Sequence, residues 1–276
     1  MSGFEAILEQ YDSSRGLQFY QTIMGGGETS IHYGIYQDSD DIKTATENIM
    51  RFMAECIQRH TALSQSKVLD LGSGTGSAAH FLVKNYDCEV VCVNISPNQN
   101  KLNQQKAAEL KILDSISIVN TSFDNLPDTW NEKFDIVWSE EAFCHGSDKL
   151  QIIRESKRVL KENGSLIFTD IMAGEGVSQT ELDSFTSKNA VTQLARPSDY
   201  FKWCLDAGFK EITYFDLSHH LKTNFKMMID RIDNNYSILV KSQVPENYLN
   251  EFKRDLHTRV NEMKDNKLSW GCFYTR

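Results

Sequence analysis

Short apolar runs alternate with longer amphipathic stretches through the middle of this 276-residue chain. The runs KVLDL, CEVVCVNI, SISIVN, KFDIVWS and GSLIFTDIM are rich in β-branched residues, and helical patterns or a loop separate them. Strands that alternate with helices form βαβ units, and nearly continuous apolar strands are typical of a sheet covered by helices on both faces. The pattern therefore predicts an α/β protein with a doubly wound, mainly parallel sheet.

The chain beyond Pro197 adds a helix, a sixth strand and, after an interval, a seventh. We expect SDYFKWCLDAG to be a helix that stops at Gly208, KEITYFDLS to be the sixth strand, and KLSWGCFYTR to be the last. Asn163–Gly164 is interpreted as a second stop signal, for the helix through Ile152. Between the last two strands, apolar residues recur at three-and-four spacing, which predicts a helical insertion with Pro245 at the start of its second helix.

The N-terminal part has no strand pattern. It carries a glycine triplet flanked by aromatic residues, which indicates a loop, followed by an amphipathic helix at about residues 42–60. A further insertion, at about residues 173–196, follows the fifth strand, and both insertions would lie near one edge of the sheet. We therefore divide the chain into an N-terminal lid and helical segment, an α/β core, a helical cap insertion and a last core strand: residues 1–60, 61–218, 219–265 and 266–276.

Composition narrows the choice of partner. A formal net charge of −9 opposes binding to nucleic acids or anionic membranes, because such binding depends on cationic side chains. The first residues do not resemble a signal peptide and no stretch has a membrane-spanning length, so we expect a soluble, cytoplasmic protein with a small-molecule substrate, as a monomer or homodimer. The six cysteines are scattered without a Cys-x-x-Cys pair, which favours reduced core thiols and no metal site.

The strongest local motif is VLDLGSGTGSAAHFL, in which a strand, an acidic residue and a glycine-rich loop precede a helix. Glycines let the backbone turn sharply and approach a ligand, and a helix N-terminus offers free N–H donors. The spacing Gly72-x-Gly74-x-Gly76, with Asp70 ahead of it, differs from the dinucleotide fingerprint, whose third glycine comes one residue later. A polar ligand is expected here, with a purely structural tight turn as the alternative.

This loop resembles motif I of the class I S-adenosylmethionine methyltransferases, whose fold is a Rossmann-like sheet with a reversed final strand. The resemblance implies S-adenosyl-L-methionine as cofactor and S-adenosyl-L-homocysteine as its product. The family places a ribose-binding carboxylate at the end of the second strand, where this chain has Asn94. The cofactor-binding residues implied by the resemblance are Tyr20, His32, Asp70, Gly72, Gly74, Gly76, Asn94, Ile95, Gln99, Ser122, Phe123, Ser139 and Glu140.

Three further stretches, YDSSRGLQFYQTIMGGGETSIHYGIY, WSEEAFCHGSDK and KLSWGCFYTR, resemble the sarcosine/dimethylglycine N-methyltransferases, which make glycine betaine. Many members of that family have tryptophan where this chain has Met24. The resemblance implies methylation of a small amine. The alternatives are another acceptor, such as a sulfur-containing osmolyte precursor or a carbon or oxygen centre of a natural product, and a non-catalytic cofactor-binding or scaffold protein.

An amine must lose its proton before it attacks, and aromatic faces suit a cationic sulfur or nitrogen. The expected catalytic residues are His145, His32, Glu141 and Tyr20. The expected substrate-binding residues are Tyr11, Tyr33, Phe143, His145, Arg196 and Trp270, with Arg231 as a second candidate for a substrate carboxylate. Core packing is the alternative for each aromatic residue, and surface exposure for each arginine.

Overall fold

The computed structural model describes residues 14–25, 30–37, 41–189 and 191–276, and in it seven strands form one sheet in the order β3-β2-β1-β4-β5-β7-β6. The strands are β1 (Lys67–Leu71), β2 (Glu89–Asn94), β3 (Ile116–Asn120), β4 (Phe134–Glu140), β5 (Leu160–Ala173), β6 (Ile212–Asp216) and β7 (Leu268–Thr275). All neighbouring pairs are parallel except those of β7, which runs antiparallel to both β5 and β6. The predicted doubly wound, mainly parallel seven-stranded sheet with a reversed final strand is confirmed.

Helices cover both faces of this sheet because neighbouring strand positions point to opposite sides. On one face, Val68 and Ile136 belong to a core shared with α3 (Ile42–Gln58) and α4 (Ser77–Tyr86). On the other, Leu69 and Val137 pack with residues of α6 (Lys149–Val159) and α8 (Pro197–Asp206). The helix α5 (Pro97–Glu109) lies beside β2 and β3.

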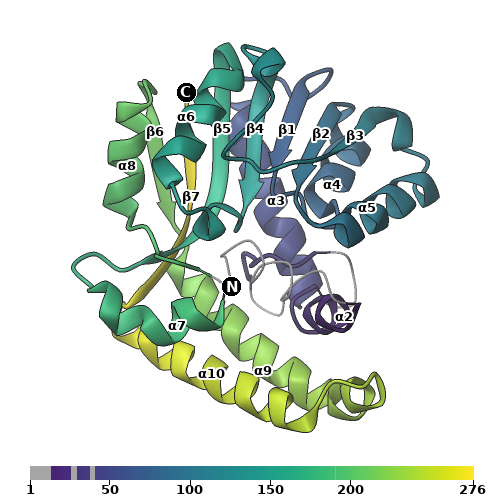
Figure 1. The fold of residues 1–276 in the computed structure, drawn as a ribbon, viewed down its shortest axis with the longest axis vertical. Helices are drawn as coiled ribbons and strands as arrows, with labels where there is room; N and C mark the ends of the chain where they lie inside the picture. Colours follow the sequence, from purple (N-terminus) through teal and green to yellow (C-terminus); the bar gives the residue numbers. More distant parts are fainter. Residues whose placement is uncertain (1–13, 26–29, 38–40, 190) are drawn as a thin grey trace.

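The helical pair α9 (Ser218–Lys241) and α10 (Glu246–Lys264) lies across the carboxyl ends of the parallel strands, at the bottom of Figure 1. The short helices α2 (Ser14–Ile23) and α7 (Asp183–Lys188) lie near this pair. The remaining elements are the 3-10 turns η1 (Leu113–Ser115), η2 (Asp128–Trp130), η3 (Phe143–His145) and η4 (Gln179–Leu182). The carboxyl edge, where parallel sheets place ligands, is therefore enclosed by segments from three parts of the chain.

Helix α6 ends earlier than the sequence predicts. Its last residue is Val159, and Leu160 already has the extended conformation, so Asn163–Gly164 lies within β5 and is not the stop signal. A register shift between the pairs Phe134–Leu160 and Ile136–Ser165 accommodates these residues as an irregularity in the strand. The other stop signal is confirmed: α8 ends at Asp206, and Gly208 has a φ of +93°.

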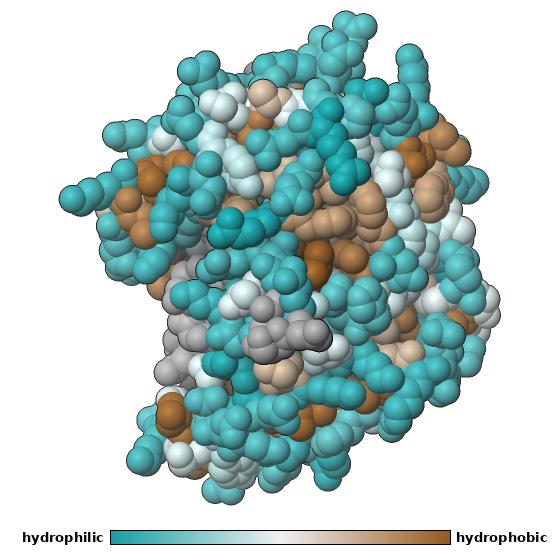
Figure 2. Space-filling model, turned by 180° about the vertical axis from the view of Figure 1, so that it is seen from behind, coloured by the Kyte–Doolittle hydropathy of each residue, from teal (hydrophilic) through white to brown (hydrophobic). Residues whose placement is uncertain are grey.

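Hydrophilic residues dominate the face drawn in Figure 2, with smaller apolar patches between them.

All six cysteines are buried and free. Among the helices of the described residues, we find none with the length and apolarity needed to cross a membrane.

Candidate active site

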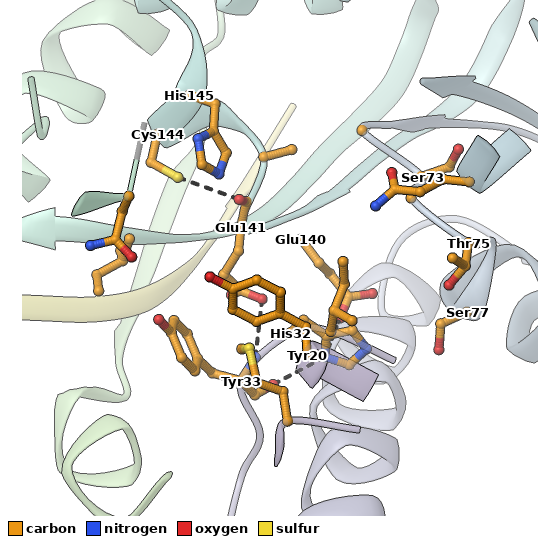
Figure 3. A pocket seen from close by; sticks show the side chains of 18 of the residues that line it. Tyr20, His32, Tyr33, Ser73, Thr75, Ser77, Glu140, Glu141, Cys144 and His145 are labelled. Carbon is orange, nitrogen blue, oxygen red and sulfur yellow. Dashed lines mark hydrogen bonds and ion pairs between the residues drawn. The ribbon is translucent and has the colours of Figure 1, made fainter. Parts of the chain in front are cut away.

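A cavity opens between the carboxyl ends of β1, β2 and β4 and the helical pair α9 and α10. It holds about 1370 Å³ of space, part of it open to solvent. One wall consists of the loops that follow the three strands, and the other of residues from α2, the segment 31–33, α7, α9 and α10. Figure 3 shows Ser73 and Thr75 of the glycine loop and Ser77 at the start of α4 on one side, and Tyr20, Tyr33, Glu141 and His145 on the other.

The glycine loop is tied to the neighbouring strand at its start. The backbone N–H groups of Gly72 and Ser73 both donate to the carbonyl of Val93, at 2.8 and 3.1 Å. Gly72 has a φ of +78°, and a Cβ added there would lie 2.3 Å from the Cβ of Ala142. This residue is glycine for two reasons, the backbone conformation and the close approach of the loop that carries the acidic residues after β4.

The end of the loop leads directly into α4. Gly76 has a φ of +86°, and a Cβ there would meet the side chain of Asn103, whose Oδ1 lies 2.9 Å from His80 Nε2. Gly74 is different, since a Cβ there would meet only Ile31 Cδ1 at 3.9 Å. Because Gly76 caps α4 without a side chain, the first N–H groups of the helix are left for another acceptor, and Ser77 and Ala78 line the cavity.

Asn94 lies at the end of β2, at the rim of the same cavity. Its Nδ2 donates to Gln99 Oε1 at 3.1 Å and to Asn100 Oδ1 at 3.2 Å, so neighbouring amides fix its orientation. With both N–H hydrogens used, the amide oxygen remains as an acceptor. Residues of α5 thus hold the side chain of Asn94 in place.

Two consecutive acidic residues, Glu140 and Glu141, follow β4 into the cavity. Trp138 Nε1 donates to Glu140 Oε1 at 2.8 Å. Glu141 accepts from Trp270 Nε1 at 2.7 Å and from the backbone N–H of Tyr33 at 3.2 Å. Burial raises the pKa of each carboxyl to about 7.

The backbone of Glu141 is itself unusual, with a φ of +48°. A non-glycine residue in the left-handed region costs free energy, and such residues are enriched at functional sites. This conformation turns the side chain from the strand end toward the N-terminal segment, where Tyr33 donates to it. Glu141 therefore joins β4, β7 and the segment 30–37.

His32 is buried beside this acidic pair. Its Nδ1 lies 3.1 Å from the carbonyl oxygen of Tyr33 and 3.1 Å from Glu140 Oε2. Both neighbours are acceptors, so Nδ1 carries the hydrogen and Nε2 carries a lone pair. Burial lowers the pKa of His32, which keeps the ring neutral near neutral pH.

Three buried polar atoms around the cavity have no hydrogen-bond partner among the described residues: Asp70 Oδ2, Ser73 Oγ and His32 Nε2. Burial also raises the pKa of Asp70 well above its usual range. Buried polar atoms without partners are costly, and several of them facing one cavity indicate a polar ligand that satisfies them. Carboxyl oxygens and an imidazole lone pair suit the amino group and hydroxyls of an amino-acid nucleoside, and the glycine loop leaves room for it.

Lys149 stabilises the turn that carries His145. The Nζ of this lysine donates to the carbonyls of Cys144, Gly146 and Gln193, at 3.3, 2.9 and 2.9 Å. Asp170 accepts from the backbone N–H of Cys144 at 3.1 Å and from the hydroxyl of Tyr200 at 2.5 Å. A buried polar network thus positions the turn, and His145 lines the cavity above it.

The raised pKa values of the acidic pair predict how stability changes with pH. A folded-state pKa of about 7, against 4.5 for an exposed glutamate, means that the folded chain binds more protons between those values. The contribution of Glu140 to stability is therefore greatest below about pH 4.5 and is lost as the pH rises through about 7. We expect Glu140→Gln, which stays neutral, to gain on the order of 2 kcal/mol relative to the parent between pH 5 and pH 8.

Urea unfolding of the ligand-free protein at the two pH values measures this difference. The exposed Glu132→Gln serves as a control and should follow the parent at both. Equal changes for Glu140→Gln and Glu132→Gln would show that Glu140 is not held protonated by the fold.

Most of the residues proposed from the sequence line this cavity. They are Tyr20, His32, Tyr33, Asp70, Gly72, Gly74, Asn94, Ile95, Gln99, Phe123, Glu140, Glu141 and His145. Tyr11 lies outside the described residues. Segments far apart in the chain thus meet here, as the resemblance implies, and their roles remain predictions.

Three of the expected cofactor-binding residues do not line the cavity. Gly76 packs against Asn103, and the hydroxyl of the fully buried Ser139 donates to the Leu71 carbonyl at 2.7 Å. Ser122 is only partly buried, and its neighbour Phe123 provides the lining instead. Gly76 and Ser139 therefore stabilise the glycine loop and do not form the surface of the cavity.

Three of the expected substrate-binding residues are also placed elsewhere. Phe143 packs in the core against Phe168, with ring centroids 4.9 Å apart. Trp270 is fully buried and reaches the site only through its hydrogen bond to Glu141. Arg196 is the N-cap residue of α8, and its side chain donates to the carbonyl of Val177 at 2.7 Å.

The second arginine candidate, Arg231, donates through Nε to the carbonyl of Thr22 at 2.7 Å and so links α9 to α2. The arginine that does line the cavity is Arg259 on α10, which the sequence analysis did not single out. A signal was present: Arg259 occupies the same helical face as the buried Leu256 and Met263, where an apolar residue is expected. Phe185, Asn189 and Phe252 were missed as well, because their positions depend on how the insertions fold back.

Comparison with known proteins agrees with this geometry. Residues 69–168 match the model of a methyltransferase domain. A sarcosine/dimethylglycine N-methyltransferase from Halorhodospira halochloris is 30% identical, over 99% of this chain and 96% of that protein. A glycine/sarcosine/dimethylglycine N-methyltransferase from Actinopolyspora halophila is 31% identical over 97% of this chain, which spans only 46% of that longer protein.

Solved structures show the same fold. A protein assigned as a sarcosine dimethylglycine methyltransferase from Galdieria sulphuraria superimposes with a TM-score of 0.87 at 27% identity, covering 94% of this chain and 97% of that one. A Haemonchus contortus phosphoethanolamine N-methyltransferase, solved with phosphomonomethylethanolamine and S-adenosylhomocysteine, gives a TM-score of 0.81 at 16% identity, covering all of this chain and 60% of that one.

Proposed function

Since this chain belongs to the sarcosine/dimethylglycine N-methyltransferase family, we propose that it methylates the nitrogen of sarcosine and dimethylglycine and so makes glycine betaine. The observation that carries this proposal is the cavity in which the glycine loop faces the acidic pair and the tyrosines of the N-terminal segment. The chain is an S-adenosylmethionine-dependent methyltransferase, and S-adenosyl-L-homocysteine is the second product.

The residues present fit this cofactor. We assign its binding to the glycine loop, to Asp70 and Asn94 at the ends of β1 and β2, and to Phe123, with Glu140 and His32 nearby. Asp70 Oδ2 and His32 Nε2, which have no partner among the described residues, match its amino group and ribose hydroxyls. When bound, the cofactor supplies a methyl group on a positively charged sulfur.

The residues of the other wall prepare the acceptor amine. A buried cavity disfavours a bare ammonium ion, and a carboxyl with a pKa of about 7 is suited to accept its proton near neutral pH. We assign this step to Glu141, which lies near His145 and Tyr20 on the same side of the cavity in Figure 3. Trp270 and Tyr33 fix the orientation of the carboxyl by donating to its two oxygens.

Aromatic side chains then suit the charge that forms. Methylation of dimethylglycine gives a quaternary ammonium, which cannot donate a hydrogen bond but is attracted to ring faces. Tyr20, Tyr33, Phe185 and Phe252 all line the cavity. Little covalent chemistry is required of the chain, so holding the amine in line with the methyl group supplies most of the rate.

Product analysis tests the proposal. The purified chain is incubated with S-adenosylmethionine and, separately, glycine, sarcosine, dimethylglycine and phosphoethanolamine, and the products are identified by mass spectrometry. We expect dimethylglycine from sarcosine and glycine betaine from dimethylglycine. Turnover of other acceptors with inert sarcosine and dimethylglycine would refute the assignment.

Met24 favours a second candidate, a related small acceptor. It lines the cavity and is buried, so it forms part of the surface that an acceptor contacts. The thioether is flexible and uncharged, and it offers no ring face to a quaternary nitrogen. A sulfur-containing osmolyte precursor, or a carbon or oxygen centre, is therefore included in the same assay.

A further inference from the structure

Arg259 is a buried cation on the acceptor side of the cavity. It lies on α10, only 6% of it is exposed, and it lines the same cavity as the glycine loop. The loop wall comes from the strand ends, whereas Arg259 belongs to the helical pair opposite. Its charge therefore faces the space left for the acceptor rather than the cofactor loop.

Aromatic rings hold the guanidinium in place. Its central carbon lies 4.9 Å from the ring centroid of Phe185 and 5.8 Å from those of Phe225 and Phe252. These rings come from α7, α9 and α10, so three separate helices build the pocket around one side chain. Ring faces favour a cation but leave its N–H groups without acceptors.

The hydrogen-bonding capacity of Arg259 is largely unused. Its Nη2 donates to Asn189 Oδ1 at 3.2 Å, which accounts for one of the five N–H groups of a guanidinium. Among the residues that the structure describes, it forms no ion pair with a carboxylate, unlike the exposed Arg254 on the same helix. Glu262 interacts with this charge electrostatically but forms no ion pair with it. A buried charge without a paired carboxylate is costly, so its position in a ligand cavity indicates that a ligand supplies the anion.

We propose that Arg259 binds the anionic group of the methyl acceptor and makes this group a requirement for catalysis. The inference rests on the proposed function, since it specifies which acceptors enter the same site. A guanidinium forms paired hydrogen bonds with a carboxylate, as in sarcosine and dimethylglycine, or with a phosphate. With Arg259 taking the anion and Glu141 facing the amine, the cavity matches a zwitterion.

The first arm of the test changes the arginine. Arg259→Met keeps much of the apolar stem and removes the charge, and Arg259→Lys keeps the charge but loses the planar fork. Arg254→Met on the same helix is the matched control, because its side chain is 74% exposed. We expect Arg259→Met to lower kcat/KM for the carboxylate acceptors about 100-fold or more, mainly through KM, and Arg259→Lys to lower it less.

The affinity for S-adenosylhomocysteine, measured by calorimetry, should stay within about threefold of the parent in all three variants, because the loop wall is untouched. Unchanged KM in Arg259→Met would overturn the inference. A large loss of cofactor affinity would also count against it, since it would indicate a collapsed cavity.

The second arm changes the acceptor and needs no variant. Sarcosine is compared with its amide and its methyl ester. Dimethylglycine is compared with trimethylamine, a tertiary amine that lacks a carboxylate. Phosphoethanolamine serves as the phosphate-bearing amine. We expect loss of the anion to lower kcat/KM about 100-fold. Equal turnover of charged and uncharged acceptors would overturn the inference even if the arginine variants failed to fold.

The two arms separate this inference from the proposed function. If sarcosine and dimethylglycine are inert but another carboxylate- or phosphate-bearing acceptor reacts in an Arg259-dependent way, the substrate assignment fails and the role of Arg259 stands. If both are methylated equally well by the parent and Arg259→Met, the substrate assignment stands and the role of Arg259 fails.

Discussion

Gly72→Ala should raise the dissociation constant for S-adenosylhomocysteine by about 100-fold or more and lower the free energy of unfolding by about 3 kcal/mol. The added methyl would lie 2.3 Å from the Cβ of Ala142, at a residue whose φ is +78°. Relief of this overlap requires the glycine loop or the turn after β4 to move. Either movement displaces cavity residues, because Ala142 follows Glu141 directly. Calorimetry and urea unfolding measure the two effects.

Two further variants separate overlap from backbone strain. Gly176 has a φ of +79° and nothing within 4 Å of an added Cβ, so Gly176→Ala should cost about 1 kcal/mol and leave the affinity unchanged. Gly72→Ala combined with Ala142→Gly removes the overlap and should recover most of the affinity. If the double variant binds no better than Gly72→Ala, contact with Ala142 is not the cause.

Glu141→Gln should lower kcat/KM by at least about 100-fold. The carboxylate accepts from two fixed donors, Trp270 Nε1 and the N–H of Tyr33, and an amide of the same shape can accept from only one of them. The other donor would face an NH₂ group, which displaces either β7 or the segment 30–37. The variant also removes the proposed base. Steady-state kinetics with sarcosine and dimethylglycine measure the loss.

Glu132→Gln is a close control for this variant, because Glu132 has a φ of +50°, as against +48° for Glu141, but is exposed. It should retain full activity. The dependence of kcat/KM on pH distinguishes a base from a purely positioning role: in the parent it should rise through about pH 7, the pKa to which burial raises Glu141. An unchanged rise in Glu141→Gln would assign the proton acceptor to another group.

The sheet was accessible from the sequence because its signals are local. Nearly continuous apolar runs marked the buried strands, and Gly208 marked the end of α8. Asn163–Gly164 misled because the same dipeptide can end a helix or accommodate an irregularity in a strand, and only the pairing with β4 decides between them. Such pairing is a tertiary property that no short window contains.

The site residues likewise fall into those that the sequence could place and those that depend on tertiary structure. Asp70, Asn94 and Glu140 lie at the carboxyl ends of their strands, and parallel strands bring these ends to one edge, so their meeting could be predicted. Arg259 could not be placed in this way, because its position depends on how α10 folds back across that edge. For Phe143 and Trp270, aromatic character is compatible both with contact to a ligand and with packing in the core. The structure places both residues in the core.

The position of β7 constrains the order in which this protein is assembled. This strand lies between β5 and β6, yet it follows every other element along the chain. During synthesis β6 emerges without its neighbour, and the gap beside β5 stays open until α9 and α10 have been made. Since Trp270 of β7 anchors Glu141, a nascent chain acquires its proposed base in a working orientation only after the last strand has inserted. Activity would thus appear late in biogenesis and in a single step.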